Sequence, residues 1–215
     1  MSSELLLGLL LGMAMALGGY WRGALSESGA VAAAIVGTII FGVGGWTWGV
    51  LLVAFFVASS ALSLYNPRRK QAVAAEKFDK GSRRDWEQVV ANGGWVTLLA
   101  LLSMRVEGAW LLPAAVGALA AVTADTWATE LGTLSPNPPR LITTFEPVPP
   151  GTSGGVTLLG TMATLAGGWF IGVIAVLLVR LGGDALPVSS QTLLLIATLS
   201  GLGGSILDSL LGATV

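Results

Sequence analysis

The fold is decided by residues 109–132, AWLLPAAVGALAAVTADTWATELG, which are apolar for most of their length and then carry two carboxylates. About 20 predominantly apolar residues suffice to cross the hydrocarbon core of a bilayer as an α-helix. Asp125 and Glu130 lie near the C-terminal end of this stretch. Because ionisable groups within membrane helices are costly and rare, the stretch predicts both a spanning helix and a functional site.

The composition is that of a helical integral membrane protein. Of 215 residues, 53% are hydrophobic and 11% are charged, whereas a soluble domain has about 25% charged residues. The mean hydropathy is +0.78. Neither Cys nor His occurs, which excludes disulfides, thiolate metal sites and imidazole bases. Any chemistry must therefore come from carboxylates, hydroxyls, amides, Lys, Arg and the backbone.

The hydropathy pattern predicts an all-α fold, a polytopic helical membrane protein in which residues 1–215 form a single transmembrane domain. About seven spanning helices are expected, at 4–21, 28–45, 47–65, 89–104, 109–132, 155–180 and 188–213. The first of these segments is not expected to be a secretory signal. Such a signal has basic residues before its apolar run, whereas here Glu4 precedes that run and no basic residue does.

The basic residues set the orientation. Seven of the eleven lie within 66–85: Arg68, Arg69, Lys70, Lys77, Lys80, Arg83 and Arg84. The positive-inside rule therefore makes 66–88 a basic cytoplasmic loop. Alternation of the helices then makes 133–154 a Pro/Gly-rich cytoplasmic loop and brings Asp125, Glu130 and Asp208 to the cytoplasmic face. Polar groups from distant parts of the sequence are thus expected to converge on one side of the membrane.

Three short motifs suggest weakly repeated helical hairpins. SGAV at 28–31, NGGWV at 92–96 and SGGV at 153–156 are each expected to open an outgoing helix. Ordinary helix-start chemistry would also place such residues there. The returning helices contain ADTWA and LDSLL, whose Asp125–Thr126 and Asp208–Ser209 pairs favour a true duplication.

Both aspartates lie on helix faces made of small residues. One face contains Ala118, Ala121, Asp125, Thr129 and Gly132, and the other contains Gly201, Gly204, Ser205, Asp208 and Gly212. Small residues allow membrane helices to approach closely, so both carboxylates are expected to point into the bundle. With the hydroxyls of Thr126 and Ser209 they would form a hard-oxygen site suited to Mg²⁺. The alternative is that each aspartate caps a helix end or pairs with a basic residue.

The two cytoplasmic loops contain candidate phosphate ligands. Lys80, Arg83 and Arg84 are dense positive charges. Asn92 is expected to begin a helix whose free N–H groups can bind an anion. The run Gly151, Thr152, Ser153, Gly154 and Gly155 can close around phosphate, although no Walker A motif occurs. The alternative is a basic loop that only follows the positive-inside rule.

Several stretches carry a family resemblance: SGAVAA, FFVASSALS, GSRRDWEQVVANGG, ADTWATELG, RLITT, PVPPGTSGGVTLLG and GSILDSLLGAT. They resemble an integral membrane family long catalogued as a domain of unknown function. The functionally assigned plant member is the phytyl-phosphate kinase of vitamin E synthesis. The family is distantly similar to dolichol and phytol kinases and to phosphatidate cytidylyltransferases. Family members commonly continue past DSLLGAT into another helix, whereas this chain ends at Val215.

The resemblance implies an enzyme that transfers a phosphoryl group from a nucleoside triphosphate, with CTP the candidate donor, to a prenyl monophosphate. Catalytic residues would be Asp125, Asp208, Arg83 and Arg84, with Mg²⁺ bound by Asp125, Asp208, Thr126 and Ser209. Substrate would be bound by Lys80, Asn92, Gly151, Thr152, Ser153, Gly154, Gly155, Thr129 and Glu130. The prenyl chain would occupy a groove open to lipid in a cytoplasmic or thylakoid membrane, and no nucleic-acid partner is expected. The alternatives are a lipid or small-molecule transporter or flippase and a CTP-dependent cytidylyltransferase.

Overall fold

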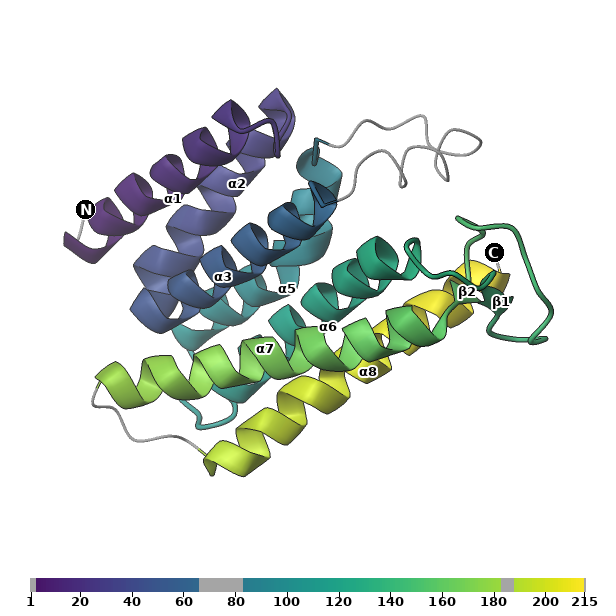
Figure 1. Cartoon of the computed structure of the whole chain (residues 1–215). Helices are drawn as coiled ribbons and strands as arrows, with labels where there is room; N and C mark the ends of the chain where they lie inside the picture. Colours follow the sequence, from purple (N-terminus) through teal and green to yellow (C-terminus); the bar gives the residue numbers. More distant parts are fainter. Residues whose placement is uncertain (1–2, 66–82, 183–187, 215) are drawn as a thin grey trace.

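The computed structural model describes residues 3–65, 83–182 and 188–214. Helices make up most of this part of the chain (Figure 1). They are α1 (Ser3–Trp21), α2 (Glu27–Ile39), α3 (Gly45–Ser63), α5 (Trp86–Ser103), α6 (Leu111–Gly132), α7 (Leu158–Gly182) and α8 (Ser190–Thr214), with the π-helix η1 (Ile40–Gly44) after α2. The predicted all-α membrane fold is confirmed, and each expected spanning segment corresponds to one of these helices.

Within the described residues, five stretches are long and apolar enough to cross a membrane, and one of them, Glu27–Ser63, includes both α2 and α3. The chain turns back between these two helices (Figure 1). Gly45 begins α3 with a φ of 82°, a left-handed conformation that favours glycine. The 37-residue apolar stretch is therefore two antiparallel helices, as the sequence predicted.

The helices form two groups with α3 and α5 between them. α1 packs along α2 at one side, and α6, α7 and α8 pack against one another at the other side (Figure 1). α5 contacts α2 and α6, and α3 contacts α6 and α7. Large apolar side chains such as Leu10, Val57, Leu177 and Leu195 remain exposed on the outside of the bundle, where lipid surrounds a membrane protein.

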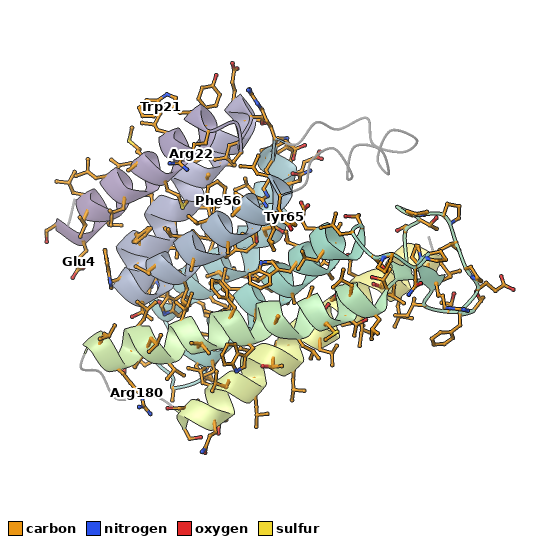
Figure 2. The ribbon with its side chains drawn as sticks, viewed as in Figure 1. Glu4, Trp21, Arg22, Phe56, Tyr65 and Arg180 are labelled. Atoms are coloured by element: carbon orange, nitrogen blue, oxygen red, sulfur yellow. The ribbon has the colours of Figure 1, made fainter. Side chains whose placement is uncertain are left out.

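Consecutive helices run in opposite directions, so the connections between them lie at two opposite ends of the bundle. We call one of these ends the loop end; it contains the turn 22–26, residues 133–157 and the C-terminus of α8. Glu4 and Arg180 lie at the opposite end, and Tyr65 lies towards the loop end (Figure 2). Each of the seven helices therefore has one terminus at the loop end, which the sequence assigned to the cytoplasmic face.

Small residues hold α6, α7 and α8 together. A Cβ added to Gly201 would lie 3.0 Å from the Cα of Gly168, and one added to Gly167 would lie 3.0 Å from the Cα of Ala124. A Cβ on Gly204 would lie 2.7 Å from that of Ala121. Only glycine permits backbones to approach this closely. The predicted packing of small-residue faces is therefore confirmed for this three-helix unit.

The expected helix start is wrong for two of the three motifs. Ser26 caps α2 by accepting a hydrogen bond from the backbone N–H of Gly29 at 3.1 Å, so SGAV does open a helix. α5 begins at Trp86, because the Asp85 side chain accepts a hydrogen bond from Gln88 N–H at 3.0 Å and caps it there. NGGWV consequently lies inside α5, and SGGV precedes α7 in a loop and a short strand.

Candidate functional site

The Pro/Gly-rich segment between α6 and α7 is an ordered loop that folds over the loop end. Its two short strands, β1 (Arg140–Leu141) and β2 (Gly155–Val156), pair in antiparallel fashion. The Ile142 N–H donates to the Gly154 carbonyl at 2.9 Å, and the Arg140 guanidinium donates to the Phe145 carbonyl at 2.8 Å. These bonds give the loop a defined shape and place its glycine-rich end beside the helices.

The glycine-rich end of the loop rests directly on α8. Gly154 has a φ of 78°, and a Cβ added there would lie 2.5 Å from the Cβ of Ala213. On the facing side, a Cβ on Gly212 would overlap the Oγ of Ser153 and would lie 3.2 Å from the backbone N of Gly154. Glycine is therefore required at both positions for the loop to dock on the helix.

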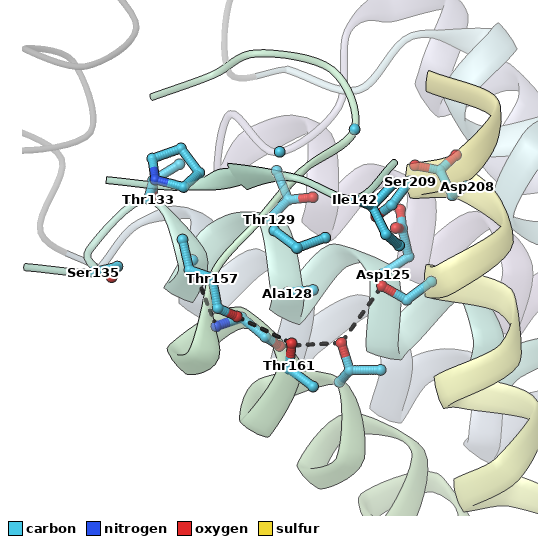
Figure 3. Close-up of a pocket in the computed structure, with 18 of the residues that line it drawn as sticks. Asp125, Ala128, Thr129, Thr133, Ser135, Ile142, Thr157, Thr161, Asp208 and Ser209 are labelled. Atoms are coloured by element: carbon cyan, nitrogen blue, oxygen red, sulfur yellow. Dashed lines mark hydrogen bonds between the residues drawn. The ribbon is translucent and has the colours of Figure 1, made fainter. Parts of the chain in front are cut away.

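A cavity of about 690 Å³ lies between this loop and the three-helix unit (Figure 3). Helix α6 contributes Asp125, Thr129 and Gly132, and α8 contributes Leu202, Ser205, Ile206, Asp208 and Ser209. Helix α7 contributes Gly160, Thr161 and Thr164, and the loop contributes Gly151, Thr152, Ser153, Gly154 and Gly155 among others. The cavity is large enough for a small-molecule ligand.

Asp125 and Asp208 enter this cavity from neighbouring helices (Figure 3). They are far apart in the sequence, yet they are close enough for their charges to interact. Asp125 is half-buried and Asp208 is exposed. The structure thus brings together the two carboxylates that the sequence placed on small-residue faces.

The surroundings of the two carboxylates are rich in hydroxyl groups. Thr164 Oγ1 donates to the Gly160 carbonyl at 3.0 Å and lies 3.4 Å from Ser205 Oγ, and Thr157 Oγ1 accepts from Gly160 N–H at 3.0 Å. The sequence reasoning did not select Thr157, Thr161, Thr164 or Ser205 as site residues. The spacing i, i+4, i+7 of the three threonines at the start of α7 was a readable signal, because it places them on one helix face.

Ser209 and Thr129 line the cavity with the aspartates, but the structure does not bring Thr126 there. Thr126 Oγ1 instead donates to the carbonyl of Val122 at 2.8 Å within its own helix. Consecutive helical residues point about 100° apart, so Thr126 cannot share the face of Asp125, whereas Thr129, one turn later, does. The Asp–Thr and Asp–Ser pairs are therefore not structurally equivalent.

The cavity is acidic. Among the residues that the structure describes, Asp125 and Asp208 are the only charged side chains in its lining, and neither Lys nor Arg lines it. No cluster of three or more acidic side chains occurs in the described part of the chain. Two carboxylates with neighbouring hydroxyls suit Mg²⁺, which commonly binds proteins through one or two carboxylates and completes its shell with water and phosphate oxygens.

Arg84 and Glu130 form a separate polar cluster with two serines of α3, away from the cavity lining. Arg84 Nη1 donates to Ser60 Oγ at 2.9 Å, and Ser63 Oγ donates to Glu130 Oε1 at 2.5 Å. Burial lowers the pKa of the Arg84 guanidinium, and the charge of Glu130 acts in the opposite direction. We call these four residues the Arg84–Glu130 cluster; the structure does not place its two charged members beside the paired aspartates.

The remaining basic and amide candidates also lie elsewhere. Arg83 is beside the turn after α1, 3.8 Å from the position of a Cβ added to Gly23. Asn92 lines a separate cavity of about 30 Å³ among α1, α2, α3 and α5. The expected helix start at Asn92 is wrong, since its N–H belongs to the interior of α5. Lys80 falls outside the described residues.

Comparison with known proteins places the chain in a family. The chain is 36% identical to Protein PGR of Arabidopsis thaliana over 99% of its own length and 79% of that protein. It is 35% identical to an uncharacterized membrane protein of Methanocaldococcus jannaschii over 88% of the chain and 74% of that protein. It is 29% identical to Protein VTE6, chloroplastic, of Arabidopsis thaliana over 86% of the chain and 56% of that protein.

No solved structure matches the chain. The model of the family described as integral membrane protein DUF92 matches residues 10–215, which include every residue of the cavity. By this match, the chain belongs to the DUF92 family of integral membrane proteins, as its motifs predicted.

Proposed function

We propose that this protein is a membrane-embedded prenyl-phosphate kinase, which transfers a phosphoryl group from a nucleoside triphosphate to a prenyl monophosphate. The observation that carries the proposal is the pair of carboxylates, Asp125 and Asp208, in a hydroxyl-lined cavity at the end of a membrane bundle. The family resemblance supplies the lipid phosphate as substrate class and CTP as the candidate donor. The concentration of Lys and Arg in 66–85 supports a cytoplasmic site.

The acidic lining makes a divalent cation necessary for this reaction, because two carboxylates repel two phosphate groups. Asp125 and Asp208 would hold Mg²⁺, with Thr129 and Ser209 beside them. When bound, the metal ion neutralises phosphate charge and aligns the two substrates. The residues present fit this role, since their ligand atoms are hard oxygens.

The protein itself would bind the two substrates, orient them and enclose them. Among the described residues, the backbone N–H groups of Gly151, Ser153 and Gly154 donate no hydrogen bond, and all three residues line the cavity, which makes them candidates to bind phosphate oxygens. The loop forms one wall of the cavity beside the helices, so a bound substrate lies between the loop and the two aspartates. The attacking oxygen belongs to a phosphate monoester, whose second pKa is about 6, so it is already ionised at neutral pH. A site without His or Cys is therefore sufficient.

The test is a substrate panel on the purified protein. Prenyl monophosphates of several chain lengths are incubated with each of the four nucleoside triphosphates, in Mg²⁺ and in EDTA, and the products are identified by mass spectrometry. We expect prenyl diphosphate and nucleoside diphosphate in equal amounts, and neither in EDTA. Release of pyrophosphate would identify a cytidylyltransferase instead, and transport without turnover would identify a transporter. The cavity and its two aspartates lie at one end of the bundle rather than at its middle, which disfavours transport.

A further inference from the structure

The cavity has a side opening between α7 and α8. Thr161 and Ile206 both line it, yet Thr161 is exposed and Ile206 is 41% exposed. A residue that lines a cavity and is also exposed marks a place where the cavity meets the surface. We call this place, bounded by Thr161, Leu202 and Ile206, the α7–α8 opening.

The opening exists because the contact between α7 and α8 loosens towards the loop end. Further from the loop, a Cβ on Gly172 would lie 2.9 Å from that of Ala197, so the two helices are in close contact there. Between α7 and α8, the polar contact nearest the loop end is that of Thr164 Oγ1 with Ser205 Oγ at 3.4 Å. Beyond it the cavity separates the helices. The Thr164–Ser205 pair therefore forms the floor of the opening.

The opening lies at the depth where phosphate and hydrocarbon meet. Thr161 is three residues from the start of α7, roughly 5 Å along the axis, and Ile206 is eight residues from the end of α8, roughly 12 Å. Each helix has 25 residues and spans roughly 38 Å, against a hydrocarbon core of roughly 30 Å. The opening therefore straddles the edge of the hydrocarbon, at the depth of Asp208, which is six residues from the end of α8, and the loop lies on its polar side.

The cavity offers polar and apolar groups to one ligand. Its lining contains the two carboxylates and several hydroxyls, together with apolar residues such as Ile142 and Val156. Leu202 and Ile206 border the opening, and Leu165, one turn beyond Thr161 on α7, is 41% exposed. An amphiphile with a phosphate head can satisfy both kinds of group at once, whereas a soluble phosphate uses only the first.

We propose that the hydrocarbon chain of a lipid phosphate leaves the cavity through the α7–α8 opening and lies against α7 and α8 in the bilayer. Thr161 and Ile206 then determine which chains pass. The inference rests on the proposed function for the identity of the head group, and it adds the route of the chain. It makes α7 and α8, rather than α1, α2 or α3, the helices that contact the lipid substrate.

Two matched pairs of variants test the route by kinetics. Ile206→Trp and Thr161→Trp fill the opening, whereas Leu207→Trp and Met162→Trp place the same side chain on neighbouring residues that are each 61% exposed and do not line the cavity. We expect Ile206→Trp and Thr161→Trp to raise KM for geranylgeranyl monophosphate about tenfold, the scale at which a pocket discriminates by shape. KM for dimethylallyl monophosphate, which has a short chain, should rise much less than that for geranylgeranyl monophosphate in Ile206→Trp and Thr161→Trp and stay unchanged in Leu207→Trp and Met162→Trp. Equal effects on both substrates, or no effect on either, would overturn the route.

A binding experiment separates this inference from the proposed reaction. A C20 prenyl monophosphate with a diazirine on its chain is photolysed in nanodiscs with the wild-type protein and the four variants, and the labelled peptides are mapped. We expect label on residues 158–165 and 202–209, reduced by Ile206→Trp and retained in Leu207→Trp. Label confined to α1, α2 and α3 would reject the opening even if turnover is observed. If the opening is labelled but the protein shows no turnover, the proposed route of the hydrocarbon chain stands and the proposed kinase activity is rejected.

Discussion

Replacing Gly154 by alanine is expected to lift the loop at 133–157 from the end of α8. Gly154 has a φ of 78°, which alanine adopts only with strain. A Cβ at this position would also lie 2.5 Å from the Cβ of Ala213 and 2.8 Å from its backbone N. Because part of the obstruction is backbone, the neighbouring side chain cannot relieve it by rotating.

The free-energy cost of the substitution is the sum of the backbone strain and the steric overlap. A left-handed conformation costs an L-residue about 1–2 kcal/mol, and overpacking costs typically about 1–3 kcal/mol. Their sum, about 2–5 kcal/mol, corresponds to a roughly 30- to 4,000-fold increase in the open population of the loop at a factor of ten per 1.4 kcal/mol. Adding Ala213→Gly should restore little, since the backbone N and Cα of residue 213 remain at 2.8 Å.

Amide hydrogen exchange measures this opening directly. The N–H groups of Ile142 and Val148 donate within the loop, to the carbonyls of Gly154 and Pro139, each at 2.9 Å. Peptides that contain them should exchange faster in Gly154→Ala. Gly45→Ala is the control, because Gly45 has a φ of 82° and nothing within 4 Å of the added Cβ, so it introduces strain alone and far from the loop. Unchanged exchange across 139–157 in Gly154→Ala would refute the docking of the loop on α8.

Three further variants test the site itself. Asp125→Asn should lower turnover by about 10²–10³-fold, the usual cost of losing one electrostatic contact to the transition state, and should weaken Mn²⁺ binding measured by electron paramagnetic resonance; unchanged Mn²⁺ affinity would exclude Asp125 as a ligand. Thr129→Val should reduce turnover, whereas Thr126→Val should not, because only Thr129 lines the cavity; the reverse order in a steady-state assay would show that α6 is rotated. Arg84→Gln should lower kcat and leave KM for the nucleotide unchanged, because Arg84 contacts Ser60 and lies outside the cavity lining; a large rise in that KM would mean that Arg84 binds phosphate directly.

The helices and the faces of the two aspartates could be predicted from the sequence because both depend on local periodicity. Apolar runs define the spans, and small residues at i, i+3, i+4 and i+7 around Asp208 place that carboxylate at a helix contact. The same rule separates Thr126 from the face of Asp125, but it would equally have excluded Ser209, which follows Asp208 and lines the cavity. The start of α5 was also readable, since Asp85 and Gln88 have the spacing of a capping box.

The position of Arg84 could not be predicted, because long-range backbone contacts determine it. Its N–H donates to the Ala24 carbonyl, and its own carbonyl accepts from Ser26 N–H, each at 3.0 Å. Gly29 makes room for this crossing, since any Cβ there would overlap the Arg84 carbonyl. No local pattern in the sequence indicates that residues 24–29 and 84 meet. Arg84 was therefore predicted to bind phosphate only because it lies in a basic stretch of the sequence.

The separation of acidic and basic groups across α6 limits how this protein can bind phosphate. Asp125 faces the cavity, whereas Glu130, five residues later and about 140° around the helix, lies in the Arg84–Glu130 cluster. The described residues thus offer the cavity hydroxyls and free N–H groups but no cationic side chain. Because none of these described groups carries positive charge, we propose that an ion held by the carboxylates compensates the charge of a phosphate placed there. Metal dependence and indifference of the nucleotide KM to Arg84 are therefore two consequences of a single arrangement. An active enzyme in EDTA would contradict the first, and a raised KM in Arg84→Gln would contradict the second.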